Sequence, residues 1–189
     1  MKTFYHFKKR LFSGAWEIKS DIPYDNLSEV PFDKNNLKQL DLPFHIRHGK
    51  KQRDIISRYE SIDIEFLSQN IYDFLSQYMD VSPYLYPIHI NDVDDVYYFV
   101  HNLPEVKCIN PQVEIPGTAD FEIPCFLLKD DLPPLFTMSR SRLKLITPEI
   151  KAAMIKAKLT NISFRPIYGV SSMEEYYELQ REDKLRSST

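Results

Sequence analysis

Glycine is scarce in this sequence. Four glycines occur among 189 residues, and they stand far apart, at Gly14, Gly49, Gly117 and Gly169. A phosphate-binding loop needs several glycines in one short segment, because only glycine lets the backbone approach a phosphate closely. The sequence therefore contains neither a dinucleotide-binding fingerprint nor a P-loop.

Cysteine is scarcer still, with only Cys108 and Cys125. Two cysteines by themselves make neither a disulfide framework nor a metal site. Neither residue has a neighbouring histidine in the sequence that would activate a nucleophilic thiol. We expect two buried, reduced thiols; a single bridge is the alternative.

Long apolar runs are absent as well. No segment reaches the ~18 apolar residues that a membrane helix requires, and Met1–Ala15 lacks the continuous apolar stretch of a secretory signal. We therefore expect a cytoplasmic protein without a membrane segment.

The formal net charge of −3 disfavours nucleic acid as a general partner, because nucleic-acid binding needs a basic surface.

One sequence pattern occurs twice, at a constant offset. The separation between Ser68 and Thr147 is the same as that between Pro87 and Pro166. Each copy has a hydrophobic strand end, a hydroxyl residue that can cap a helix, a short amphipathic helix, and a return strand closed by Pro-Ile. Two related units are the interpretation that we adopt, although helix followed by strand is common enough for chance to be the alternative.

This pattern predicts an α+β fold with a mixed, largely antiparallel sheet, a few short helices and two related strand–helix–strand units. We expect a single domain over residues 1–189. It divides into an N-terminal β and loop region (1–53), a repeat-containing core (54–170) and a C-terminal helix and tail (171–189). Alternating or β-branched segments predict further strands at Phe44–His48, Val96–Val100, Val106–Ile109 and Phe121–Leu128. A last helix is expected at Ser171–Leu179, where Ser171 and Glu174 have the spacing of a capping box, and we expect the end of the charged segment Arg181–Thr189 to be disordered.

The second copy carries a family resemblance. Its segments are Phe136-Thr137-Met138, then Leu145 to Met154, then Leu159-Thr160-Asn161-Ile162-Ser163-Phe164. They resemble immunity protein family eleven of bacterial polymorphic toxin systems, formerly a domain-of-unknown-function family, over roughly Asp54 to Pro166. Asn161 stands where that family usually has glycine. Asparagine tolerates the left-handed backbone conformation better than most residues, so we expect the turn to be kept.

The resemblance implies a function without catalysis. Such a protein binds a cognate toxin domain and neutralises it by stoichiometric inhibition, with no cofactor, no metal and no catalytic residue. An adaptor that binds some other protein is a further hypothesis, which the sequence cannot separate from the first. The oligomeric state stays open.

The densest group of titratable residues is His89, Asp92, Asp94, Asp95 and His101. One interpretation is a solvated turn between two strands. Another is a metal or acid–base site, which would make the protein a small metal-dependent hydrolase or nuclease. The third, favoured by the resemblance, is an acidic contact for a basic patch on a partner.

Our candidate partner-binding residues are Asp92, Asp94, Asp95, Tyr97, Asp130 and Asp131. Two basic groups are interpreted more simply. Arg140 and Arg142 are read as a charged outward face rather than a phosphate site, and Gly49 to Arg53 as a basic turn.

Overall fold

The structure is a computed structural model of the chain. It describes residues 2–11, 13–20, 43–59, 61–101, 103–106, 125–127, 132–138 and 143–187, with the backbone alone at 61–63, 125–127, 138, 180 and 183–187. Internal contacts divide the chain into two compact units. Unit 1 comprises Met1–Phe7, Pro104–Ala152 and Phe164–Thr189, and unit 2 comprises Lys8–Leu103 and Ala153–Ser163.

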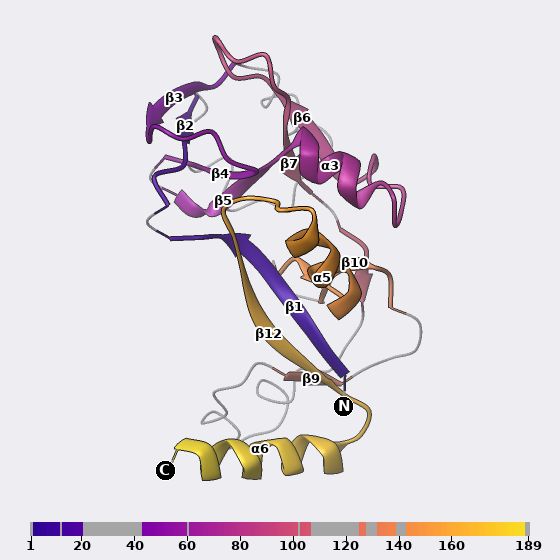
Figure 1. Ribbon diagram of the computed structural model, residues 1–189. Helices are drawn as coiled ribbons and strands as arrows, with labels where there is room; N and C mark the ends of the chain where they lie inside the picture. The colour runs from indigo at the N-terminus through magenta and orange to yellow at the C-terminus, as the bar shows by residue number, and fades with distance from the viewer. Residues whose placement is uncertain are drawn as a thin grey trace. The chain divides into compact units, whose positions relative to one another are not determined.

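Unit 2 is built on a six-stranded mixed sheet (Figure 1). Its strands are β2 (Glu17–Lys19), β3 (His45–His48), β4 (Ile55–Arg58), β5 (Ser61–Ser68), β6 (Leu85–Ile88) and β7 (Tyr97–Val100). They lie in the order β3-β2-β4-β5-β7-β6, antiparallel except for the parallel pair β2 and β4. The helix α3 (Gln69–Leu75) packs on this sheet, where the ring of Tyr72 stacks on that of Tyr98 with centroids 4.4 Å apart.

The core of unit 2 consists of apolar side chains gathered around this sheet. Phe66 is central, because its ring lies edge-on to Phe44 at 5.4 Å and tilted against Phe99 at 6.0 Å. Aromatic pairs in this geometry add to the free energy of area burial. The buried members are Ile18, Phe44, Ile56, Ile64, Phe66, Ile88, Ile90, Tyr97 and Phe99.

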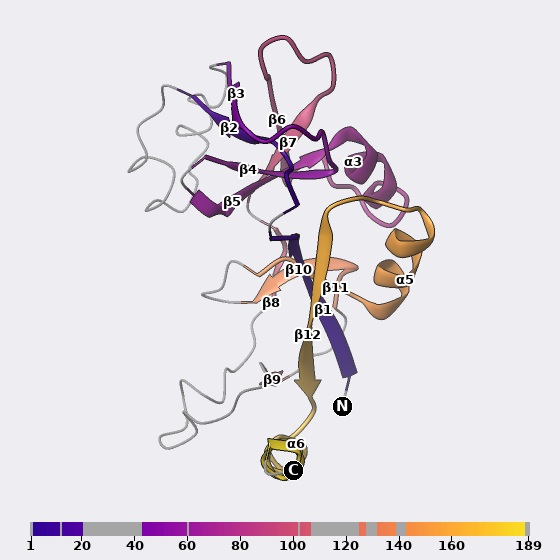
Figure 2. The ribbon, with the colours of Figure 1, turned by 60° about the vertical axis from the view of Figure 1, so that its left-hand side comes forward.

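Unit 1 holds most of a second six-stranded sheet, in the order β8-β10-β11-β1-β12-β9, of which only the last two residues of β1 and the first two of β12 belong to unit 2. The strands are β1 (Lys2–Lys9), β8 (Glu105–Val106), β9 (Cys125–Leu127), β10 (Leu135–Met138), β11 (Leu145–Ile146) and β12 (Ile162–Val170). Figures 1 and 2 show β1 and β12 side by side in this sheet. Its buried cluster contains Phe4, Phe136, Leu145 and Ile167. The helices that follow β11 and β12 are α5 (Pro148–Lys156) and α6 (Met173–Ser187).

The two predicted strand–helix–strand units are confirmed. Ser68 caps α3 by accepting a hydrogen bond from the backbone N–H of Ile71 at 3.4 Å. Thr147 does the same for α5 through the N–H of Ile150 at 3.5 Å. The buried positions of the two amphipathic faces correspond as well; they include Ile71 and Leu75 on α3, and Ile150 and Met154 on α5. The α+β fold follows from these units and from the largely antiparallel pairing.

The same topology recurs in both sheets, beyond what the sequence repeat predicts. In unit 2 the two repeat strands β5 and β6 are separated by β7, and in unit 1 the repeat strands β11 and β12 are separated by β1. Outside them, β4 lies antiparallel to β5 and parallel to β2, just as β10 lies antiparallel to β11 and parallel to β8. Five strands of each sheet therefore share one order. We call the strand between the two repeat strands the inserted strand. In unit 2 it is β7, which follows its repeat in the sequence, and in unit 1 it is β1, which begins the chain.

The strand register agrees as well. Leu67 lies opposite Ile55 on one side and Tyr98 on the other. Its counterpart in the second copy of the repeat, Ile146, lies opposite Leu135 and Tyr5.

The contact between helix and inserted strand is also repeated. Lys151 occupies the position in the second copy that Tyr72 occupies in the first. Its Nζ lies 3.6 Å from the ring centroid of Tyr5, the residue that takes the place of Tyr98 in the register. A stacked aromatic pair in unit 2 thus corresponds to a cation–π contact in unit 1.

Three expectations need correction. The strands form two sheets, whereas the sequence suggested one. The last helix extends to Ser187, beyond the expected end at Leu179. Its cap lies one residue later than expected: Ser172 Oγ accepts from the N–H of Glu175 at 3.2 Å, and the Glu175 carboxylate accepts from the N–H of Ser171 at 2.7 Å.

Two predicted strands are described only in part, because their other predicted residues lie outside the described ones. The strand expected at Val106–Ile109 corresponds to β8, and residues 107–109 lie outside the described residues. The strand expected at Phe121–Leu128 corresponds to β9.

Among the helices that the structure describes, none combines the length and apolar character needed to cross a membrane.

Candidate functional site

The acidic turn, residues 91–95, leads into β7 and has a well-defined backbone. Phe44 pairs with the segment before it: the N–H of Phe44 donates to the His89 carbonyl at 2.8 Å, and the N–H of Asn91 donates to the Phe44 carbonyl at 2.7 Å. Within the turn, the N–H of Val93 donates to the Ile90 carbonyl at 3.2 Å, and Asp92 adopts a left-handed φ of 61°. Aspartate tolerates that conformation better than most residues. The sequence prediction of a turn here is confirmed.

The side chains of Asp92, Asp94 and Asp95 are all exposed. Asp95 accepts a hydrogen bond from the Gln52 side chain, which links the turn to the segment before β4. The turn therefore presents three carboxylates to solvent from a hydrogen-bonded backbone. Their role in binding a partner stays a prediction.

Tyr97 was predicted to contact a partner, and its position corrects that expectation. The side chain is fully buried, and its hydroxyl donates to the Arg53 carbonyl at 2.7 Å. Burial raises the pKa of the Tyr97 phenol to about 12, and the nearby carboxylates of Asp54 and Asp95 add to this effect. Side chains alternate along β7, so Tyr97 and Phe99 face the core. The alternation was visible in the sequence, but which face is buried was not.

The two histidines of the predicted group lie in different environments. His89 is exposed, whereas the His101 ring lies edge-on to Tyr86 with centroids 6.3 Å apart and has a buried Nδ1 without a hydrogen-bond partner among the described residues. Burial lowers the pKa of His101. Within the described part of the chain, no three His, Cys, Asp or Glu side chains converge in a way that could hold a metal ion. The metal-dependent hydrolase or nuclease stays an alternative prediction.

Several candidates cannot be placed. Asp130, Asp131, Cys108, Arg140 and Arg142 lie outside the described residues, and Cys125 is described only through its backbone in β9.

A buried carboxylate that sequence reasoning missed lies immediately before β4. Oδ2 of Asp54 accepts from the backbone N–H of Thr160 at 2.6 Å and from its hydroxyl at 2.7 Å. Oδ1 accepts from Ser68 Oγ at 2.8 Å and from Asn70 Nδ2 at 3.0 Å. Burial alone would raise the pKa of Asp54, but these hydrogen bonds outweigh it and hold the pKa below its usual value. Asp54 is therefore an ionised, fully hydrogen-bonded group at neutral pH.

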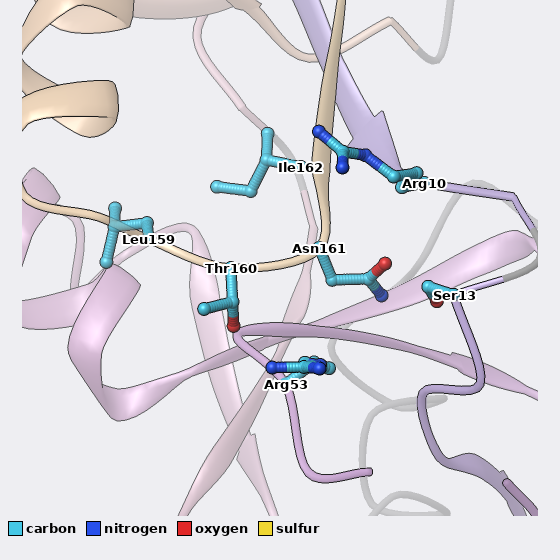
Figure 3. A pocket seen from close by; sticks show the side chains of 7 residues that line it. All are labelled: Arg10, Ser13, Arg53, Leu159, Thr160, Asn161 and Ile162. Carbon is cyan, nitrogen blue, oxygen red and sulfur yellow. The ribbon is translucent and has the colours of Figure 1, made fainter.

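A pocket of about 360 Å³ lies next to this network in unit 2 (Figure 3). It is lined by Arg10, Ser13, Arg53, Leu159, Thr160, Asn161 and Ile162. Figure 3 shows these side chains arriving from three segments: the chain after β1, the segment before β4, and the turn that leads into β12 together with the first residue of that strand. Apart from Leu159 and Ile162, every lining side chain carries a hydrogen-bond donor. Arg53 belongs to the predicted basic turn, but no local signal in the sequence indicated that Arg10 lies near it.

Backbone hydrogen bonds hold these segments together. The N–H groups of Lys50 and Lys51 both donate to the Gly14 carbonyl at 3.1 Å, and the N–H of Arg10 donates to the Asn161 carbonyl at 3.0 Å. Gly49 is required here, because its φ is 85° and a Cβ would overlap the Ala15 carbonyl. The expectation for Asn161 is confirmed: it has a left-handed φ of 63°.

Comparison with known proteins gives no relative. No family model matches this chain. No curated protein and no solved structure matches it either. The resemblance to immunity protein family eleven stays a prediction that rests on its motifs.

Proposed function

We propose that this protein is an immunity protein, which binds a cognate bacterial toxin domain and neutralises it by one-to-one inhibition without catalysis. The observation that carries the proposal is the acidic turn, in which Asp92, Asp94 and Asp95 are exposed on a hydrogen-bonded backbone. The motif resemblance over Asp54 to Pro166 gives the class of partner.

Charge and order both favour this turn as a contact. Exposed carboxylates raise the association rate with a basic surface through long-range attraction. A turn that is already ordered loses little conformational entropy when it binds. The expected partner surface is therefore basic, as it is in toxins that act on nucleic acid, whose substrate binding depends on lysine and arginine.

Co-expression tests the proposal. The C-terminal domain of the protein encoded immediately upstream is produced in cells with or without this chain, and surviving cells are counted. We expect rescue, together with a stable one-to-one complex on co-purification. A neighbouring product that is harmless, or one that kills equally in both cultures, contradicts the proposal.

A charge-altered chain, with Asp92→Asn and Asp94→Lys, separates the role of the turn from that of the rest of the protein. It should remain folded, because both side chains are exposed and asparagine keeps the left-handed backbone at position 92. If it rescues as well as the unaltered chain, the inhibitory surface lies elsewhere and the immunity function itself still stands.

A further inference from the structure

The pocket beside Asp54 contains two guanidinium groups that nothing described in the structure neutralises. Arg10 is exposed at the end of β1, and Arg53 is half-buried before β4. Among the described residues, no carboxylate forms an ion pair with either of them. The nearest acid by sequence, Asp54, directs both oxygens to Thr160, Ser68 and Asn70. The pocket lining therefore includes two positive groups, and the nearest carboxylate by sequence is already hydrogen-bonded elsewhere.

The pocket also contains one acceptor without a donor. Asn161 Nδ2 donates to the Ile55 carbonyl at 2.6 Å, which fixes the orientation of the amide. Its Oδ1 is buried and has no hydrogen-bond partner in the described structure. Figure 3 shows this side chain extending toward the part of the pocket where Arg10 and Ser13 lie. A buried acceptor of this kind costs free energy until a donor reaches it.

The other lining groups set the shape and polarity of a ligand. Ser13 Oγ accepts from the Ala15 N–H at 3.3 Å, so its hydroxyl hydrogen is left to donate. Thr160 is already engaged, since its hydroxyl donates to Asp54 and accepts from the Asp54 N–H at 3.1 Å. Leu159 and Ile162 supply apolar wall.

We propose that this pocket binds a small phosphate monoester that carries hydroxyl groups, of the sugar phosphate class. Arg10 and Arg53 would receive the phosphate, because planar guanidinium groups match its oxygens in pairs. A ligand hydroxyl would donate to Asn161 Oδ1. A volume of about 360 Å³ is within the range of small-ligand sites. This site is separate from the partner-binding function and does not depend on it.

Calorimetric titration of the full chain tests the site with three probes: ribose 5-phosphate, inorganic phosphate and ribose. We expect ribose 5-phosphate to bind most tightly, inorganic phosphate more weakly, and ribose not measurably. Arg10→Gln and Arg53→Gln should each weaken ribose 5-phosphate binding about tenfold or more, as expected for the loss of a charged hydrogen-bonding group. Arg165→Gln is the matched control, because this exposed arginine lies in unit 1 and outside the pocket.

Asn161→Gly tests the hydroxyl contact. Glycine keeps the left-handed backbone and removes the amide, so the preference for ribose 5-phosphate over inorganic phosphate should disappear while phosphate binding remains. Thermal unfolding of each variant checks that it is folded. The absence of binding by any probe at millimolar concentration overturns the proposal. It is also overturned if Arg165→Gln weakens binding as much as the pocket variants do, or if the unaltered chain binds inorganic phosphate as tightly as the ester.

Discussion

Asp54 and Thr160 lie far apart in the sequence and are joined by three hydrogen bonds. The same carboxylate accepts from Ser68, the residue that caps α3. One buried acid therefore ties the start of a helix in the first repeat to the turn that follows α5 in the second. Both contacts lie within unit 2.

Asp54→Asn should lower the free energy of unfolding by about 2–4 kcal/mol, because an amide cannot accept all four hydrogen bonds and places an N–H against another donor. Urea denaturation at neutral pH measures the loss. Asp94→Asn is the control, since Asp94 is exposed and should change stability by less than ~0.5 kcal/mol.

Asp54→Asn should also change how the stability of the fold depends on pH. The pKa of Asp54 is lowered in the folded state, so its ionised form stabilises the fold. That contribution is complete above the unfolded-state pKa of about 3.9 and is lost as the pH falls through the folded-state pKa. Asp54→Asn should therefore show a shallower loss of stability on acidification. An equally steep loss in the variant would contradict the assigned role of the carboxylate.

Removing the two helix caps should lower the stability of the protein by unequal amounts. Ser68→Ala and Thr147→Ala each remove an N-cap, which costs about 1 kcal/mol. Ser68→Ala should cost more, because the Ser68 hydroxyl also donates to the buried Asp54, whereas the side-chain hydrogen bond of Thr147 goes to the exposed carboxylate of Glu149. Denaturation of the two variants side by side measures the difference. A larger loss in Thr147→Ala would mean that the link to Asp54 adds nothing.

The buried His101 should make the stability of the fold sensitive to acid just below neutral pH. Burial lowers its pKa, so the folded state disfavours the protonated ring. The unfolded state then binds more protons, and stability should fall as the pH drops below the ordinary histidine value of about 6.5. His101→Phe should reduce this dependence between about pH 7.5 and pH 5, measured as the midpoint of thermal unfolding. His89→Phe is the matched control, because the exposed His89 should leave the pH dependence unchanged.

The acidic turn predicts a kinetic effect on partner binding, under the proposed function. Asp92→Asn with Asp94→Asn should slow association with the toxin domain about tenfold at low salt, with little change in unfolding midpoint. Glu174→Gln with Glu178→Gln removes the same charge from exposed positions on α6 and serves as the control. Surface plasmon resonance at two salt concentrations measures the rates. Equal slowing in both variants would show a general charge effect and no specific contact at the turn.

Local features of this protein could be predicted from sequence. The hydroxyl caps at Ser68 and Thr147 and the left-handed conformation at Asn161 depend on interactions within a few residues, so their residue types indicate them. The placement of Tyr97 could not be predicted, because alternation along a strand shows two faces without saying which one is buried.

The two strand–helix–strand units could be read from the chain without a structure, because one constant offset aligns their caps, apolar helix positions and return strands. The strand that lies between the repeat strands of each sheet is known only from the fold: β7 in unit 2, and β1 from the start of the chain in unit 1. The same is true of the contact between Asp54 and Thr160, and of the pocket that Arg10 and Arg53 line together. Pairings of this kind join residues distant in sequence, and they depend on how whole strands and turns pack, which no local pattern of residues records.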